Sequence, residues 1–252
     1  MHNGRFHHDG VKIAFLDEGE GDPIVLVHGF ASTAQVNWVG PGWITTLKRA
    51  GRRAIALDNR GHGQSSKLYD AAAYHSELMA DDVCALLDHL GIGRADVMGY
   101  SMGARICAFL ALQHPERVRR AVFGGLGIHL VHSPGLPENI AEALEAPSLA
   151  HVHDPYGRMF RAFADQTRSD RRALAACIRG SRQNLRVEQV ARITVPVLIA
   201  VGTKDPIAGS AHALAALMPH ARAFDIPGRD HMLSVGDRRF KEEVLRFLGE
   251  ER

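Results

Sequence analysis

Hydrophobic positions along the chain alternate between short continuous runs and runs spaced at helical intervals. Ile24–Val27 and Val195–Val201 are continuous apolar runs, typical of strands buried on both faces of a parallel sheet. Apolar residues at positions 83, 86, 87 and 90 have the spacing of one helix face. Related patterns predict strands at Arg53–Leu57, Asp96–Gly99, Val118–Phe123 and Arg222–Ile226, helices at Trp43–Ala50, Met102–His114 and Ala211–Leu217, and a last helix with Phe240, Val244, Phe247 and Leu248 on one face.

The first residues predict a β-hairpin. Asp9-Gly10 is a turn signal, and it separates Arg5–His8 from Val11–Leu16. The segment also contains three histidines, His2, His7 and His8. No further ligand cluster completes a metal site around them, so we expect them on an early strand or in solvent and predict no metal.

Residues 126–190 interrupt the alternation of strands and helices. This segment has no clear strand and has the pattern of helices joined by proline-containing loops. Repeated strand–helix units predict a three-layer α/β/α sandwich with a mostly parallel sheet. We therefore expect a core formed by residues 1–125 and 191–252. Residues 126–190 are then a helical cap that roofs a crevice at the carboxyl ends of the strands.

Composition narrows the class of protein. The 252 residues are 46% hydrophobic and 23% charged, with a net charge of +2, which argues against nucleic acid or an anionic membrane as partner. Three widely spaced cysteines form neither a disulfide framework nor a metal knuckle. The first residues contain no apolar run of signal-peptide length, and no stretch of about 20 apolar residues occurs, so we expect no transmembrane helix. We expect a cytoplasmic protein with a small-molecule partner; the oligomeric state is open.

The candidate nucleophile is Ser101, in the motif Gly99-Tyr100-Ser101-Met102-Gly103 between a predicted strand and a predicted helix. A serine on such a tight turn is lifted above the sheet edge at a helix N-terminus, where free N–H groups favour negative charge. Small residues on both sides let the neighbouring backbone pass without clashes. The alternative for Ser101 is a helix N-cap.

A serine nucleophile needs a base and an acid that orients it. His231 and Asp205 each follow a predicted strand, so both lie at the same edge of the sheet as Ser101. The chain order Ser, Asp, His is the one expected on this type of fold. Asp230 is a rival acid, but an adjacent residue rarely reaches the far side of its neighbour's ring.

An oxyanion forms when the serine attacks a carbonyl, and it needs donors already in place. We expect one to be the backbone N–H of Met102. The second is assigned to the N–H of Phe30, in the loop after Ile24–Val27, where Gly29 lets the backbone approach the substrate. His28 in the same loop has the alternative role of a hydrogen bond within the loop.

These motifs resemble the α/β-hydrolase fold family, in its serine-nucleophile, esterase-like branch with a short cap. The matching pieces, in family order, are His28-Gly29-Phe30, Asp58-Asn59-Arg60-Gly61-His62-Gly63-Gln64-Ser65, the motif around Ser101, Gly202-Thr203-Lys204-Asp205-Pro206 and Gly228-Arg229-Asp230-His231. The resemblance implies an eight-stranded sheet, a cap between strands six and seven, and a structural role for Asp58 and Arg60. It implies no metal or organic cofactor.

The substrate is the least determined property. Serine in place of aspartate argues against haloalkane dehalogenases and epoxide hydrolases of the family. We expect hydrolysis of a small carboxylic ester or lactone through an acyl-enzyme. The alternatives are a carbon–carbon bond hydrolase acting on vinylogous diketones, a thioesterase, a lyase or perhydrolase variant, and a receptor with little turnover such as the plant strigolactone and karrikin receptors.

The expected cap is rich in arginine. Residues 158–186 contain only two acidic residues, Asp165 and Asp170. The same stretch contains eight arginines, at 158, 161, 168, 171, 172, 179, 182 and 186. One helix face is expected to line an apolar pocket, with Met159, Phe160 and Phe163 as substrate-binding candidates, while an arginine binds a substrate carboxylate. The alternative for these arginines is a solvated outer face.

Overall fold

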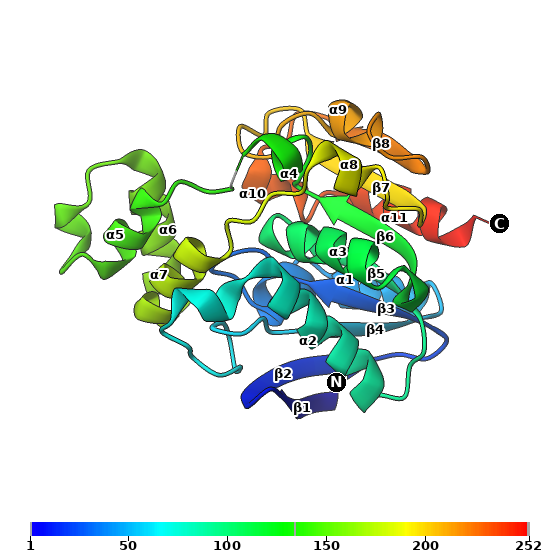
Figure 1. Cartoon of the computed structure of the whole chain (residues 1–252), viewed down its shortest axis with the longest axis horizontal. Coiled ribbons are helices and arrows are strands. Elements are labelled where there is room, and N and C mark those ends of the chain that lie inside the picture. Colours follow the sequence, from blue (N-terminus) through cyan, green and yellow to red (C-terminus); the bar gives the residue numbers. More distant parts are fainter. Residues whose placement is uncertain (1, 134, 251–252) are drawn as a thin grey trace.

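The computed structural model describes residues 2–133 and 135–250, which form one eight-stranded sheet with helices on both faces (Figure 1). The strands are β1 (His2–His8), β2 (Val11–Glu18), β3 (Asp22–Val27), β4 (Arg52–Leu57), β5 (Ala95–Tyr100), β6 (Val118–Gly124), β7 (Val197–Gly202) and β8 (Ala221–Ile226). Their order in the sheet is β1-β2-β4-β3-β5-β6-β7-β8. The β1–β2 and β2–β4 pairs are antiparallel and all later pairs are parallel, which confirms the expected mostly parallel α/β/α architecture.

The predicted hairpin is present at the antiparallel edge. Asp9 and Gly10 both have positive φ, 47° and 75°, the backbone of a two-residue turn that matches the twist of the flanking strands. The histidines of this segment lie on β1. Among residues 2–133 and 135–250, no group of three or more His, Cys, Asp or Glu side chains is placed to hold a metal.

Eleven α-helices are found in the described part of the chain. They are α1 (Trp43–Arg49), α2 (Ser76–His89), α3 (Met102–Gln113), α4 (His129–His132), α5 (Asn139–Glu145), α6 (Pro155–Gln166), α7 (Arg171–Gly180), α8 (Val187–Val190), α9 (Ala211–Ala215), α10 (His231–Ser234) and α11 (Arg238–Gly249). None of these helices has both the length and the apolar character needed to cross a bilayer.

Alternation along the central strands assigns the helices to the two faces of the sheet. Ile24 and Leu26 of β3 pack in the cluster that contains α1 and α11. Val25 and Val27 pack in the opposite cluster, with α2, α3 and α9. Because both faces of β3 are covered, its sequence is a continuous apolar run rather than an alternating one.

The N-terminus of α3 lies directly against the ends of β3 and β5. A Cβ atom built on Gly103 would lie 2.0 Å from the carbonyl oxygen of Val27, and one on Gly99 would lie 2.1 Å from the carbonyl oxygen of Gly103. Real side chains do not tolerate such contacts. The two glycines of the motif therefore allow the strand and the helix to meet at Ser101.

Between β6 and β7 the chain forms α4 to α8 and no strand among its described residues. Figure 1 shows α5, α6 and α7 grouped beside the sheet. Asp154 and Asp170 cap α6 and α7 by accepting hydrogen bonds from backbone N–H groups of the first turn. Leu174 and Cys177 of α7 join the same hydrophobic cluster as α3, so this segment packs on the core.

Candidate active site

Ser101 lies between the last residue of β5 and the first residue of α3. Its backbone has φ 55° and ψ −114°, a conformation that costs a non-glycine residue about 1–3 kcal/mol. Its N–H donates to the carbonyl oxygen of Gly124 at the end of β6, at 2.8 Å. Ser101 has no side-chain capping bond to α3, so its hydroxyl is available for another partner.

That partner is His231. Its Nε2 atom lies 3.0 Å from Oγ of Ser101, and its Nδ1 atom lies 2.7 Å from Oδ2 of Asp205. Because a carboxylate only accepts, Nδ1 carries the ring proton and Nε2 is left to accept the serine proton. The side chain of Asp205 is fully buried, and its Oδ1 accepts hydrogen bonds from the N–H groups of Ile207 and Ala208. The structure thus brings together the three residues that the sequence proposed for catalysis.

Asp230, the rival acid, has a different task. Its Oδ1 accepts hydrogen bonds from the N–H groups of Met232 and Leu233, at 3.0 and 2.8 Å. It is therefore the N-cap of α10, and His231 is the first residue of this short helix. The sequence placed His231 in a loop, because four helical residues are too few to give a periodic pattern.

The proposed oxyanion donors lie beside the serine. Met102 is the first residue of α3, so its N–H has no acceptor within the helix. Phe30 follows β3, and both residues line a cavity with Ser101. A Cβ atom on Gly29 would lie 3.5 Å from Cβ of Ser101, so the loop that carries Phe30 passes close to the nucleophile.

Histidines near this loop hold it in place. Nδ1 of His28 donates to the carbonyl oxygen of Gly29 at 2.7 Å, while its Nε2 accepts the N–H of Asn59 at 2.9 Å. His62 bonds in the same way, to the carbonyl oxygen of Arg60 and the N–H of Ala31. Burial lowers the pKa of both rings, to about 3 for His62, so both are neutral.

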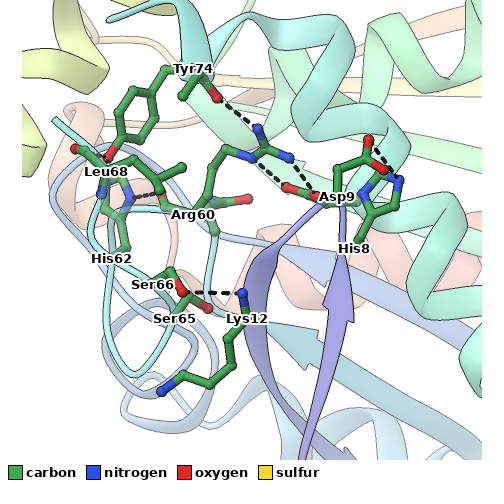
Figure 2. Close-up of polar contacts among 12 residues, drawn as sticks. His8, Asp9, Lys12, Arg60, His62, Ser65, Ser66, Leu68 and Tyr74 are labelled. Carbon is green, nitrogen blue, oxygen red and sulfur yellow. Dashed lines mark hydrogen bonds and ion pairs between the residues drawn. The ribbon is translucent and has the colours of Figure 1, made fainter. Parts of the chain in front are cut away.

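The Asp58–Ser65 stretch is tied down by a buried ion pair. Nε and Nη2 of Arg60 each lie 2.7 Å from an oxygen of Asp82 on α2, and His8 of β1 binds the same carboxylate. Figure 2 shows Arg60 extended between His62 on one side and His8 on the other. No bond of this network reaches Ser101. This geometry agrees with the structural role expected for Arg60.

Two cavities meet at Ser101. The aromatic cavity, of about 260 Å³, is lined by Phe30, Pro41, Phe160, Phe163, His231 and Val235 among others. The Arg105 cavity, of about 40 Å³, includes Met102, Arg105, His129, Ile178 and Ser181 in its lining. Among the three substrate-binding candidates, Phe160 and Phe163 line the aromatic cavity and Met159 does not. Phe160 is buried, whereas Met159, the residue before it on α6, is 37% exposed.

The arginines of residues 158–186 do not line either cavity. Arg161 pairs with Asp165, Arg179 pairs with Glu145, and Arg172 lies over the ring of Tyr69. The arginine that does line a cavity with Ser101 is Arg105 of α3, which the sequence interpretation missed. Its signal was available: Arg105 is the one charged residue in α3, a helix that is apolar except for Arg105 and Gln113, and it lies one turn after the serine.

Cys177 of α7 lies against the nucleophile turn. Its Sγ atom is 3.7 Å from Sδ of Met102, and the thiol is fully buried. Burial raises the pKa of Cys177 to about 12. The thiol is therefore protonated, and it acts here as a packing group between α7 and α3.

The mostly parallel sheet and the Ser-His-Asp arrangement at its carboxyl edge are those of a hydrolase-type α/β fold. The chain belongs to the alpha/beta hydrolase fold family, whose sequence pattern matches residues 22–169. A 2-hydroxymuconate semialdehyde hydrolase of Pseudomonas sp. (strain CF600) is 36% identical over 150 residues, which cover 57% of this chain and 49% of that protein. The match thus spans about half the length of that relative.

Solved structures match the whole described fold. A hydrolase from Pseudomonas aeruginosa PA01 superimposes with a TM-score of 0.80 at 27% identity, covering 98% of both chains. Est816, described as an N-acyl homoserine lactone degrading enzyme, has a TM-score of 0.76 at 25% identity and covers 97% of this chain and 99% of its own. The relatives therefore include hydrolases with different substrates.

Proposed function

We propose that the protein is a serine hydrolase that cleaves a small carboxylic ester or lactone through an acyl-enzyme. His231 takes the proton of Ser101 as the serine attacks the carbonyl carbon, and the N–H groups of Phe30 and Met102 stabilise the oxyanion. Asp205 keeps the imidazole oriented and stabilises its charged form. His231 then protonates the leaving group and activates the water that releases the acid.

One observation carries this proposal: the hydrogen-bonded chain from Ser101 through His231 to Asp205 opens into two cavities. The 3.0 Å between Oγ of Ser101 and Nε2 of His231 is within reach for proton transfer to the ring, and the 2.7 Å bond from Nδ1 to Asp205 orients that ring. Two cavities provide separate places for the two halves of an ester. The lactone part is supported by the likeness to Est816.

Active-site labelling tests the nucleophile without knowledge of the substrate. A fluorophosphonate should label Ser101, as located by peptide mass spectrometry, and p-nitrophenyl butyrate should be hydrolysed. Ser101→Ala should lose the label and about 10³-fold or more of the rate. Ser148→Ala, a surface serine, is the matched control and should retain both. Label on another residue, or full activity of Ser101→Ala, would overturn the proposal.

The same assay separates an enzyme from a receptor-like relative. An enzyme releases p-nitrophenol continuously, whereas a receptor with little turnover gives one equivalent per site and then stops. We expect continuous release. A burst of one equivalent with no steady-state rate would favour the receptor.

A second candidate is hydrolysis of a carbon–carbon bond on the same triad. It is supported by the 36% identity over 150 residues to a 2-hydroxymuconate semialdehyde hydrolase. Loss of the absorbance of 2-hydroxymuconate semialdehyde measures this activity directly. A kcat/KM above that for the best ester would make carbon–carbon cleavage the main reaction.

We also propose a cytoplasmic setting. Cys84, Cys107 and Cys177 are all buried free thiols. Free thiols are typical of a reducing compartment.

A further inference from the structure

Arg105 is a buried cation next to the candidate nucleophile. It lies four residues after Ser101 on α3, and its backbone N–H donates to the carbonyl oxygen of Ser101 at 3.1 Å. Residues with this spacing share one face of a helix, about 5–6 Å apart at Cβ. The side chain is 4% exposed and lines the Arg105 cavity together with Ser101 and Met102.

The partners of Arg105 are all neutral. Nη1 donates to the carbonyl oxygen of Gln183 and the side-chain oxygen of Asn184. Nη2 donates to the carbonyl oxygens of His129 and Ser133. These bonds fix the orientation of the guanidinium, but none of the four acceptors carries a negative charge that would neutralise it. No described residue accepts a hydrogen bond from its Nε.

Two other arginines are equally buried, and they show what is missing. Arg60 and Arg161 are each 4% exposed, and each binds a carboxylate, Asp82 and Asp165 respectively. Burying a cation without an anion is costly, which is why buried arginines are normally paired. Among the residues that the structure describes, Arg105 is the buried arginine without such a partner.

The surroundings of Arg105 add positive charge rather than remove it. No aspartate or glutamate is present among the described residues that line its cavity. Burial and the nearby positive charge of Arg182 lower the pKa of Arg105 to about 10. At neutral pH the guanidinium still carries its charge, so the cavity has a positive potential next to the serine.

We propose that the Arg105 cavity binds a carboxylate group of the substrate, with its ester carbonyl at Ser101. The cavity volume of about 40 Å³ has room for about three water-sized groups, which suits a short carboxylate-terminated chain. The carboxylate replaces the anion that Arg105 lacks within the protein. This inference rests on the proposed serine hydrolase function and specifies its substrate class.

The positions of the two cavities also orient the substrate. His231, which protonates the leaving group, lines the aromatic cavity and is absent from the described lining of the Arg105 cavity. The alcohol part therefore occupies the aromatic cavity, against Phe160 and Phe163. The acyl part extends toward Arg105. A half-ester of a short dicarboxylic acid with an apolar alcohol has this arrangement of groups.

Binding to an inactive variant tests the subsite. Ser101→Ala is titrated by calorimetry with benzyl hydrogen glutarate and with the benzyl ester of glutaramic acid, which replaces the carboxylate by a neutral amide of the same size. We expect the acid to bind at least tenfold more tightly than the amide. Equal affinities would overturn the carboxylate subsite.

Substitutions assign the preference to Arg105. Arg105→Met in the Ser101→Ala background should bring the affinity for the acid down to that for the amide, and Arg105→Lys should restore part of the difference. Arg179→Met, which removes an arginine paired with Glu145, is the matched control and should keep the acid preference. An acid preference that persists in Arg105→Met would overturn the assignment. If that variant does not fold, the comparison of acid and amide binding to Ser101→Ala, which retains Arg105, still decides whether the cavity prefers a carboxylate.

Hydrolysis by the unmodified chain separates the two proposals. If it cleaves both esters at equal kcat/KM and Ser101→Ala binds them equally, the subsite is wrong and the serine hydrolase stands. If Ser101→Ala prefers the acid but the unmodified chain cleaves neither ester, the subsite stands and ester hydrolysis is wrong.

Discussion

The hydroxyl of Tyr100 donates a hydrogen bond to the main-chain carbonyl oxygen of His231. Their rings are also in contact, with centroids 5.5 Å apart. Tyr100 is the last residue of β5 and immediately precedes Ser101. The strand that positions Ser101 therefore also holds the backbone of His231, although Ser101 and His231 lie 130 residues apart in the sequence.

Tyr100→Phe should loosen the placement of His231 while leaving the substrate cavities intact. We expect the free energy of unfolding to fall by about 1 kcal/mol and kcat to fall about two- to tenfold, with little change in KM. Steady-state kinetics with p-nitrophenyl butyrate measure this effect. Tyr69→Phe is the control, because Tyr69 is exposed and binds Asp170. A rise in KM at constant kcat would contradict a positioning role for Tyr100.

Gly103→Ala should be severely destabilising. The added Cβ would lie 2.0 Å from the backbone of Val27, and backbone at the end of a central strand cannot move aside. We expect a loss of about 3 kcal/mol or no folded protein at all. Gly93→Ala is the matched control, since a Cβ there has no atom within 4 Å and its φ is not positive. Denaturant unfolding compares the two, and equal stabilities would refute the close approach.

Asp82→Asn tests the ion pair that anchors the Asp58–Ser65 stretch. Removing the carboxylate leaves the Arg60 charge buried, so we expect a loss of about 3–5 kcal/mol in the free energy of unfolding. Glu242→Gln breaks the exposed pair with Arg238 and should cost less than about 1 kcal/mol. Catalysis by the folded fraction should survive, because neither Arg60 nor Asp82 contacts Ser101. Similar losses for both variants would contradict the buried pairing.

The protein should lose stability as the pH falls below about 6.5. His62 has its pKa lowered by burial from 6.5 to about 3, so between these values the unfolded chain binds a proton that the folded chain does not. The stability from neutral His62 is complete above pH 6.5 and declines by about 1.4 kcal/mol per pH unit toward pH 3. The lowered pKa of His28 acts in the same direction. Urea unfolding at pH 7.5 and 5.5 measures the decline, and His62→Gln should reduce it.

Strands and site residues could be predicted from the sequence where a local residue pattern follows directly from a position in the sheet. Ile24–Val27 is an apolar run because both faces of β3 are covered, so the strand was predictable. Ser101, Asp205 and His231 were found because the carboxyl ends of parallel strands meet at one edge. The contacts of Ser101 with His231 and of His231 with Asp205 follow from that geometry.

Other features depend on partners that a local pattern does not identify. The placement of β4 between β2 and β3 is a matter of distant pairing. Met159 and Phe160 are neighbours in sequence, and only the rotation of α6 about its axis decides which of them lines a cavity. Arg179 finds its carboxylate at Glu145, 34 residues away, whereas Arg105 finds none. The apolar pattern around Arg105 indicated burial but not the cavity it lines.

Because Cys177 contacts Met102, its reactivity reports transient local opening between α7 and α3. Cys177 is fully enclosed between α7 and α3, so a thiol reagent reaches it only when these helices separate. The rate of its modification, measured in a chain without Cys84 and Cys107, then reports how often α7 separates from α3 at this contact. A ligand that spans both cavities should slow the modification of Cys177. The thiol would then report how ligand binding affects the separation of α7 and α3.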